Sequence, residues 1–297
     1  MNSAVTHVGF SDESSWNKGR YRSLGLVTLP LEASLQTKED LQAILSESAV
    51  TEFKWKKLRG ARERFAARKL LFYTIKRAVE GAFRVDVLIW DTQDARHSVA
   101  GRDDIDNLQR MYFHLFKNVM GRRWSDNAIW RFYPDEQTSI DWESMRVFLA
   151  KASSSIEPQI SIFHNRPFRW ILRRYFHIEQ IIEGISVEQP LLQLADLFAG
   201  MAVFSYTKYA AYEAWLLANS PTQPLFPVDT KSKNGFSNGD IEKFTTLKYF
   251  DQQCKSHKLG VSLKSNRGLR TPNPANPINF WLYQPQHPMD RAPTRDA

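Results

Sequence analysis

The stretch "LLQLADLFAGMAVF" (residues 191–204) is an apolar segment that carries one carboxylate, Asp196, in its middle. We expect it to form a helix in which the small residues Ala199 and Gly200 allow a close approach to a sheet. Burying an isolated ionised carboxylate is costly unless a partner compensates its charge. The stretch therefore predicts a helix packed against a sheet, with a partner for the charge of Asp196.

Strand patterns and helix patterns alternate on the N-terminal side of this helix. Apolar residues recur with period two in strands and at three- and four-residue steps in helices. On this basis the sequence predicts strands at 5–14, 20–30, 83–96 and 128–137, an extended segment at 168–186, and helices at 37–48, 58–79, 103–120 and 142–154. Strands that alternate with helices after an initial meander indicate an α/β or mixed three-layer fold.

The texture of the chain changes after about residue 219. "NSPTQPLFPVDTKSKNGFSNGD" (219–240) is rich in Pro, Gly, Ser and Asn, which is typical of loops. The last 27 residues hold six of the 14 prolines, around one apolar stretch, "PINFWLY" (277–283). We therefore expect a core domain over 1–215 and a loop-rich, Pro-rich extension over 216–297 that packs on it.

Composition limits the class of protein. The chain has 297 residues, 42% of them hydrophobic, and a net charge of +8, which favours polyanionic partners such as nucleic acid. An ordinary basic soluble protein fits the same charge equally well. The single cysteine, Cys254, excludes an internal disulfide and fits a reducing compartment. Neither a signal-peptide pattern nor a long apolar segment is present, so we expect a cytoplasmic protein without a membrane partner.

Three carboxylates occupy positions that otherwise face a core. Asp12 ends the apolar face of the strand at 5–14, Asp91 ends that of the strand at 83–96, and Asp196 lies in the apolar helix. Any one of them could cap a loop or pair with an arginine or lysine. Together they would repel one another unless a divalent cation neutralised them. Oxygen ligands without a Cys/His cluster predict Mg²⁺ or Mn²⁺ rather than zinc.

Four short motifs occur in a fixed order: "FSDES" (10–14), "EFKW" (52–55), "VLIWD" (87–91) and "LQLADLFAG" (192–200). In these motifs the chain resembles the bacterial family known as domain of unknown function 3800, whose members resemble the ribonuclease H-like superfamily. The likeness covers roughly residues 8–205. It implies an α/β fold with a ribonuclease H-like mixed five-stranded sheet flanked by helices, followed by a C-terminal extension.

The resemblance also implies a catalytic site. Ribonuclease H-like enzymes carry acids on the first strand, near the first helix, on the fourth strand and on a late helix. In this chain the resemblance assigns those positions, as metal ligands, to Asp12, Glu52, Asp91 and Asp196. Glu52 lies either on a strand at 50–56 or in the first turn of a helix. Two Mg²⁺ or Mn²⁺ ions at such a site hydrolyse phosphodiester bonds and leave 5′-phosphate and 3′-hydroxyl ends.

Three further residues are candidates for supporting roles. Glu13 points across the strand from Asp12 and is a reserve ligand. Lys54 could reach a phosphate or the acid cluster, or extend into solvent. Gln193, one turn before Asp196, could orient a carboxylate or simply bond to backbone. By contrast, the acids of "PDEQ" (134–137) are expected to lie in a solvated turn.

Two stretches combine positive charge with aromatic residues, as nucleic-acid surfaces do. The first is the predicted helix after Lys54, and the second is "NRPFRWILRRYF" (165–176). A solvated helix face and a solvated strand explain these patterns equally well. The candidate nucleic-acid-binding residues are Arg62, Lys69, Lys76, Arg166, Arg169, Arg173 and Arg174.

Three hypotheses about function follow. The first is a divalent-metal-dependent nuclease acting on DNA or RNA. The second is a non-catalytic protein that binds nucleic acid or a partner through a ribonuclease H-like fold. The third, implied by the resemblance alone, is a component of a bacterial defence or mobile-element system whose Pro-rich end docks a protein partner. The sequence contains no nucleotide-binding glycine loop, G-x-S-x-G elbow or zinc knuckle.

Overall fold

The computed structural model of the chain describes residues 4–93, 103–136, 140–141, 176–219 and 235–284. The helix expected at 142–154 lies outside these residues. So do four candidate nucleic-acid-binding residues, Arg166, Arg169, Arg173 and Arg174.

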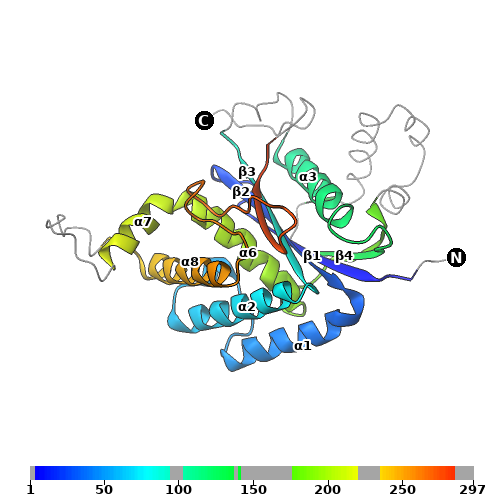
Figure 1. Ribbon diagram of the computed structural model, residues 1–297, viewed down its shortest axis with the longest axis horizontal. Helices are drawn as coiled ribbons and strands as arrows, with labels where there is room; N and C mark the ends of the chain where they lie inside the picture. The colour runs from blue at the N-terminus through cyan, green and yellow to red at the C-terminus, as the bar shows by residue number, and fades with distance from the viewer. Residues whose placement is uncertain (1–3, 94–102, 137–139, 142–175, 220–234, 285–297) are drawn as a thin grey trace.

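The described residues form a mixed six-stranded sheet with helices on both faces (Figure 1). The strands follow the order β5-β4-β1-β2-β3-β6. β1, β2 and β3 form an antiparallel meander, whereas β4 is parallel to β1, β5 is parallel to β4, and β6 is parallel to β3. Their bounds are β1 His7–Ser14, β2 Tyr21–Pro30, β3 Arg84–Asp91, β4 Trp130–Pro134, β5 Ile178–Ile181 and β6 Ile278–Leu282. The expected α/β fold is confirmed.

Helices form one layer on each side of the sheet. One face is covered by α1, α2, α6 and α8, with α7 extending beyond them, and the other face is covered by α3 with the π-helical turn η3 (Figure 1). A large apolar core fills the first interface and a smaller, aromatic core fills the second. The helix bounds are α1 Leu31–Glu47, η1 Trp55–Lys57, α2 Ala61–Val79, α3 Asp104–Leu115, η3 Phe116–Met120, α6 Pro190–Thr207, α7 Tyr209–Ala218 and α8 Asn238–Ser256.

The C-terminal region contributes to the same layers as the rest of the chain. β6 comes from the apolar stretch of the Pro-rich end and pairs with β3, and α8 packs against α2. The boundary expected at residue 215 falls inside α7. The final residues of the described chain therefore complete the sheet.

The helix α6 is buried on almost all sides and crosses β1 and β2. Gly25 on β2 makes this close approach possible, because a Cβ atom there would lie 2.6 Å from the carbonyl oxygen of Ala195. The hydroxyl of Ser23 donates a hydrogen bond of 2.8 Å to the carbonyl of Ala199. Backbone-to-backbone packing at Gly25 thus fixes the position of Asp196 relative to β1.

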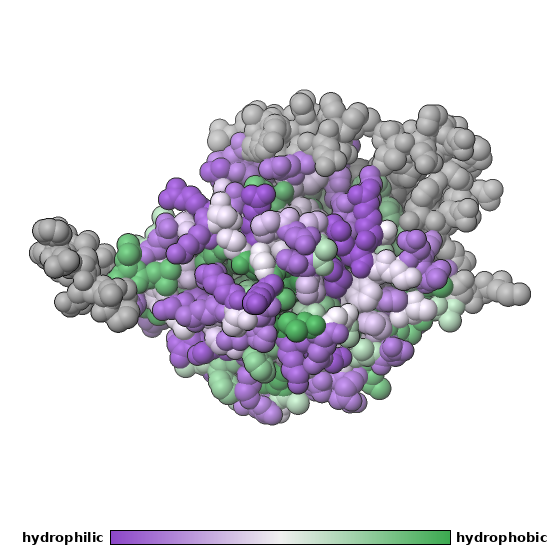
Figure 2. Space-filling view, in the orientation of Figure 1, coloured by the Kyte–Doolittle hydropathy of each residue, from purple (hydrophilic) through white to green (hydrophobic). Residues whose placement is uncertain are grey.

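The surface seen in Figure 2 is mostly hydrophilic, with apolar side chains in small separate areas. Within the described part of the chain, no helix combines the length and apolar character needed to cross a bilayer.

Candidate functional site

Two carboxylates meet at the carboxyl ends of neighbouring parallel strands. β1 and β4 pair so that Ser11 lies opposite Pro134, and the amide of Asp135 donates a 3.0 Å hydrogen bond to the carbonyl of Ser11. Asp12 and Asp135 are therefore adjacent. Both are buried, with 8% and 3% of their surface exposed.

The helix α6 holds the motif at 52–55 against this edge of the sheet. Gln193 Oε1 accepts a 2.8 Å hydrogen bond from the amide of Phe53, and Asp196 Oδ2 accepts a 2.5 Å hydrogen bond from the amide of Trp55. Phe53 and Trp55 are buried in the large core. Because Lys54 between them has an extended backbone, alternate side chains point in opposite directions. Lys54 consequently faces the carboxylates of the sheet edge.

Lys54 lies at the centre of the acid cluster. Its Nζ atom is 3.3 Å from Asp135 Oδ2, 3.7 Å from Asp12 Oδ2 and 3.9 Å from Glu52 Oε1. Only 12% of the Lys54 side chain is exposed. We call Asp12, Glu52, Asp135 and Asp196, together with this lysine, the acid cluster. Glu52 also accepts a hydrogen bond of 3.1 Å from the exposed ammonium of Lys57.

One buried ammonium does not neutralise this set of carboxylates. Burial and the charge of Asp196 hold the pKa of Asp12 well above its usual value, although Lys54 opposes them. Burial also raises the pKa of Asp196 to about 6, against the lowering effect of the Trp55 amide and of Lys54. Burial alone would lower the pKa of Lys54, but the surrounding carboxylates, Asp12 foremost, raise it overall. A further cation nearby would therefore favour the ionised forms of Asp12 and Asp196.

The donors suit a hard divalent cation, because they are carboxylate oxygens from four separate segments. As the side chains stand, no group of three His, Cys, Asp or Glu residues among those the structure describes is arranged to hold a metal ion. The Lys54 ammonium lies between three of these carboxylates. In this arrangement the cation among the carboxylates is the Lys54 ammonium.

The expectation that Asp91 joins Asp12 and Asp196 is wrong. Asp91 ends β3, which is separated from β1 by β2, and it lies four residues beyond Val87, the residue in register with Asp12 across Gly25. From strand spacing and rise, Asp91 is roughly 16 Å from Asp12. Its carboxylate is paired instead with Arg20, whose Nη2 is 2.7 Å from Asp91 Oδ2.

Asp135 is the acid that sequence reasoning missed. Its motif, "PDEQ", was expected to form a solvated turn, yet Asp135 is buried beside Asp12. The available signal was its place directly after a strand that Pro134 ends. If that strand pairs in parallel with β1, its carboxyl end must lie at the same edge as Asp12.

The predicted supporting residues occupy three different environments. Lys54 reaches the acids rather than solvent. Gln193 bonds to backbone on both sides, donating to the carbonyl of Ser186 and accepting from the amide of Phe53. Glu13 faces the opposite side of the sheet, where its Oε1 accepts a 2.7 Å hydrogen bond from Tyr112. Gln193 thus shapes the site through the backbone of 52–55.

The three described candidates for nucleic-acid binding lie on α2. Arg62 pairs with Glu63, Lys69 pairs with Glu47, and Lys76 is exposed. A second basic group lies nearer to the acid cluster, in the segment after "EFKW". There a cavity of about 320 Å³ is lined by Lys56, Arg59, Ser237, Gly239, Asp240 and Lys243.

Comparison with known proteins finds two similar proteins, neither of which has a named activity. No protein-family model matches the chain. The uncharacterized protein ORF2′ of Methanothermobacter thermautotrophicus is 42% identical over 303 residues, covering 99% of this chain and 100% of the relative. The uncharacterized protein ORF2 of the same organism is 41% identical over 303 residues with the same coverage. The chain belongs to the family of these two Methanothermobacter thermautotrophicus proteins.

Proposed function

We propose that the chain is a divalent-metal-dependent nuclease of ribonuclease H-like fold, with the acid cluster as its catalytic site. The observation that carries the proposal is the convergence of Asp12, Glu52, Asp135 and Asp196 around one buried ammonium. Four buried or partly buried acids gain nothing for folding by meeting at one point. Such an arrangement is typical of sites that bind cations for chemistry.

The order of the acids along the chain supports a ribonuclease H-like arrangement. Asp12 lies on the first strand, Glu52 between the first two helices, Asp135 directly after the fourth strand, and Asp196 on a late helix. Asp91, by contrast, ends the third strand. If Asp135, and not Asp91, is taken as the acid of the fourth strand, the four acids occupy the positions that the resemblance implies.

Each residue of the acid cluster has a distinct role in this proposal. Asp12, on the central strand, would bind both ions, while Asp135, Asp196 and Glu52 provide the other oxygen ligands. When bound, Mg²⁺ or Mn²⁺ lowers the pKa of the attacking water and stabilises the departing oxygen. Lys54 holds the carboxylates together before a metal binds, and it competes with the metal for them. Lys56 and Arg59 lie beside the site and suit the phosphates of a strand.

The proposal is tested by cleavage of labelled single- and double-stranded DNA, RNA and hybrid substrates, with Mg²⁺, with Mn²⁺ and with a chelator. Asp12→Asn and Asp135→Asn are expected to abolish cleavage. Asp91→Asn is the matched control, because it makes the same chemical change outside the cluster and should leave the rate unchanged. Cleavage that survives in Asp12→Asn and Asp135→Asn would end the nuclease proposal.

One observation favours a second candidate, a non-catalytic binding protein. Lys54 already satisfies three carboxylates by ion pairs, as a purely structural cluster would. In that case no substrate is cleaved under any metal condition, while nucleic acid or a protein partner still binds. The same substrate panel, read by both cleavage and retention, separates the two candidates.

A further inference from the structure

A second site lies far from the acid cluster, on the α3 side of the sheet beside the edge strand β6. A cavity of about 440 Å³ opens there, a size that is typical of small-molecule sites. Two strands, β2 and β3, lie between β6 and β1 in the sheet. Asp12 points to the other face of the sheet. The two sites are therefore independent.

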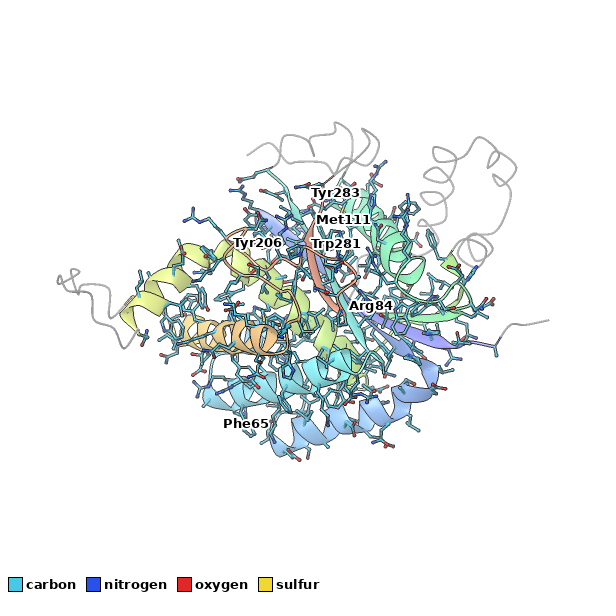
Figure 3. The ribbon with its side chains drawn as sticks, in the orientation of Figure 1. Phe65, Arg84, Met111, Tyr206, Trp281 and Tyr283 are labelled. Atoms are coloured by element: carbon cyan, nitrogen blue, oxygen red, sulfur yellow. The ribbon has the colours of Figure 1, made fainter. Side chains whose placement is uncertain are left out.

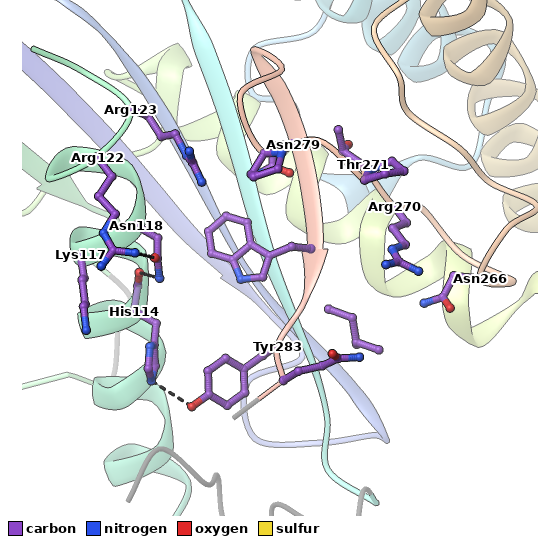
Figure 4. Close-up of a pocket in the computed structure, with 15 residues that line it drawn as sticks. His114, Lys117, Asn118, Arg122, Arg123, Asn266, Arg270, Thr271, Asn279 and Tyr283 are labelled. Carbon is purple, nitrogen blue, oxygen red and sulfur yellow. Dashed lines mark hydrogen bonds between the residues drawn. The ribbon is translucent and has the colours of Figure 1, made fainter. Parts of the chain in front are cut away.

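Positive charge dominates the walls of this cavity. Lys117 lies in η3, Arg122 and Arg123 follow its end, and Arg270 approaches from the other side of β6 (Figure 4). Among the residues that the structure describes, none that lines the cavity is an Asp or a Glu. Within the described part of the chain, these four cations form no ion pair. Such a group suits an anion with more than one negative charge.

Buried charges that contact the lining residues Asn279 and Arg123 also bear on this preference. The buried carboxylate of Asp86 is already engaged by Arg84, with Nη2 to Oδ1 at 3.2 Å, and by Asn279, with Nδ2 to Oδ1 at 3.1 Å. Arg123 is left beside two like charges, Arg84 and Arg122. Burial lowers the pKa of Arg123 most; Asp86 opposes this lowering, and the smaller effects of Arg84 and Arg122 add to it. A bound anion would relieve this repulsion.

An aromatic surface and an unused acceptor complete the pocket. Trp281, on β6, and Tyr283, just after it, belong to the α3 side of the sheet (Figure 3), and Trp281 is only partly buried. The Tyr283 hydroxyl and His114 Nε2 share a 2.9 Å hydrogen bond that fixes both rings. Asn279 Oδ1 is buried and accepts no hydrogen bond from any described residue. A planar ring can stack on the tryptophan, and an amino or hydroxyl group can donate to the asparagine.

We propose that this pocket binds a nucleoside phosphate. The phosphates are held by Arg122, Arg123 and Arg270, and the base stacks on Trp281. The same chemistry is offered by a free nucleotide and by the 5′-phosphorylated end of a nucleic-acid strand. The proposal does not depend on the nuclease activity, since binding requires neither a metal nor the acid cluster.

Calorimetric titration of the full chain in EDTA tests the pocket with four probes: ADP, inorganic pyrophosphate, and a short oligodeoxynucleotide with a 5′-phosphate or with a 5′-hydroxyl. Arg122→Gln/Arg123→Gln should weaken ADP binding by about tenfold or more, because two charge-assisted contacts are lost. Trp281→Ala should weaken ADP but leave pyrophosphate binding unchanged. Arg270→Gln, on the other side of β6, provides an independent variant if the double variant does not fold.

Lys38→Gln/Lys255→Gln is the matched control, because it removes two cations from α1 and α8, on the opposite face of the sheet and outside both sites. It should change ADP binding by less than about twofold. Binding of ADP alone identifies a free nucleotide as the ligand, and binding that requires the 5′-phosphate of the oligonucleotide identifies a strand end. Either result supports the pocket when it is lost in the arginine variants. Absence of binding by all the phosphorylated probes, or equal weakening in the control, overturns the proposal.

Discussion

Replacing Lys54 by methionine removes the only ammonium inside the acid cluster while retaining most of the side-chain volume. The change takes away the ammonium that lies 3.7 Å from the buried carboxylate of Asp12, and it removes one ion pair of Asp135. Breaking a buried ion pair from one side typically costs 3–5 kcal/mol. Here the carboxylates can instead take up protons, at about 1.4 kcal/mol per pKa unit, which limits the cost. We expect a loss of about 2–4 kcal/mol in the free energy of unfolding at pH 8 in EDTA.

The sign of the pH dependence follows from the raised pKa values of Asp12 and Asp196. A carboxyl group whose pKa is higher in the folded state stabilises the fold below its unfolded pKa, and this stabilisation is lost as pH rises through the folded value. For Asp196 that interval runs from 3.8 to about 6. Without Lys54 both pKa values rise further, so Lys54→Met should approach the stability of the wild type as the pH falls towards 5.

Urea unfolding in EDTA at pH 5, 6.5 and 8, for wild type and Lys54→Met, measures both effects. Lys57→Met is the matched control: the Lys57 side chain is 60% exposed and its ammonium pairs with Glu52, so the substitution should cost about 0.5 kcal/mol or less. If the acids bind a divalent cation, Mn²⁺ at one hundred times its dissociation constant should raise the free energy of unfolding of Lys54→Met by about 2.7 kcal/mol. Equal stability of wild type and Lys54→Met at pH 8, or no stabilisation of either by Mn²⁺, would refute the reasoning.

Three other substitutions test how the site is built. Gly25→Ala places a Cβ atom 2.6 Å from the Ala195 carbonyl and should lower the free energy of unfolding by about 1–3 kcal/mol, measured by thermal denaturation. Gln193→Leu leaves the buried Phe53 amide without its acceptor and should cost about 1–3 kcal/mol in urea; an unchanged midpoint would show that water replaces the side chain. Asp196→Asn cannot ionise, so its stability in EDTA should vary less between pH 4 and 6 than that of the wild type.

The sequence predicted the strand and the helix that carry Asp12 and Asp196, but it did not predict which strands lie next to them. The period-two pattern placed Asp12 near the end of a strand, and the apolar stretch around Asp196 was expected to be a helix packed on a sheet. Both are local properties, because the alternation of buried and exposed residues follows directly from strand or helix geometry. Asp91 also ends a strand, as expected, but that local fact did not place it near Asp12.

In the C-terminal region, too, local structure was predictable from the sequence and non-local contacts were not. Its prolines and glycines predicted loops, and the apolar stretch at 277–283 was recognised. Nothing local indicated that this stretch pairs with β3, or that Arg270 and Trp281 thereby meet Arg122 and Arg123 across a cavity. The pocket is assembled from segments about 150 residues apart in the chain, and the sequence contains no signal for such a meeting.

The sequence by itself determined the α/β class, the helix that carries Asp196 and the acid that ends the first strand. The tertiary structure decided which acids meet. A parallel crossover puts β4 next to β1 and brings Asp135 beside Asp12, while an antiparallel meander carries Asp91 two strands away to Arg20. It also placed the Lys54 ammonium among the carboxylates. The physical reason is that periodicity specifies the face on which a side chain lies, whereas strand order is set by non-local pairing.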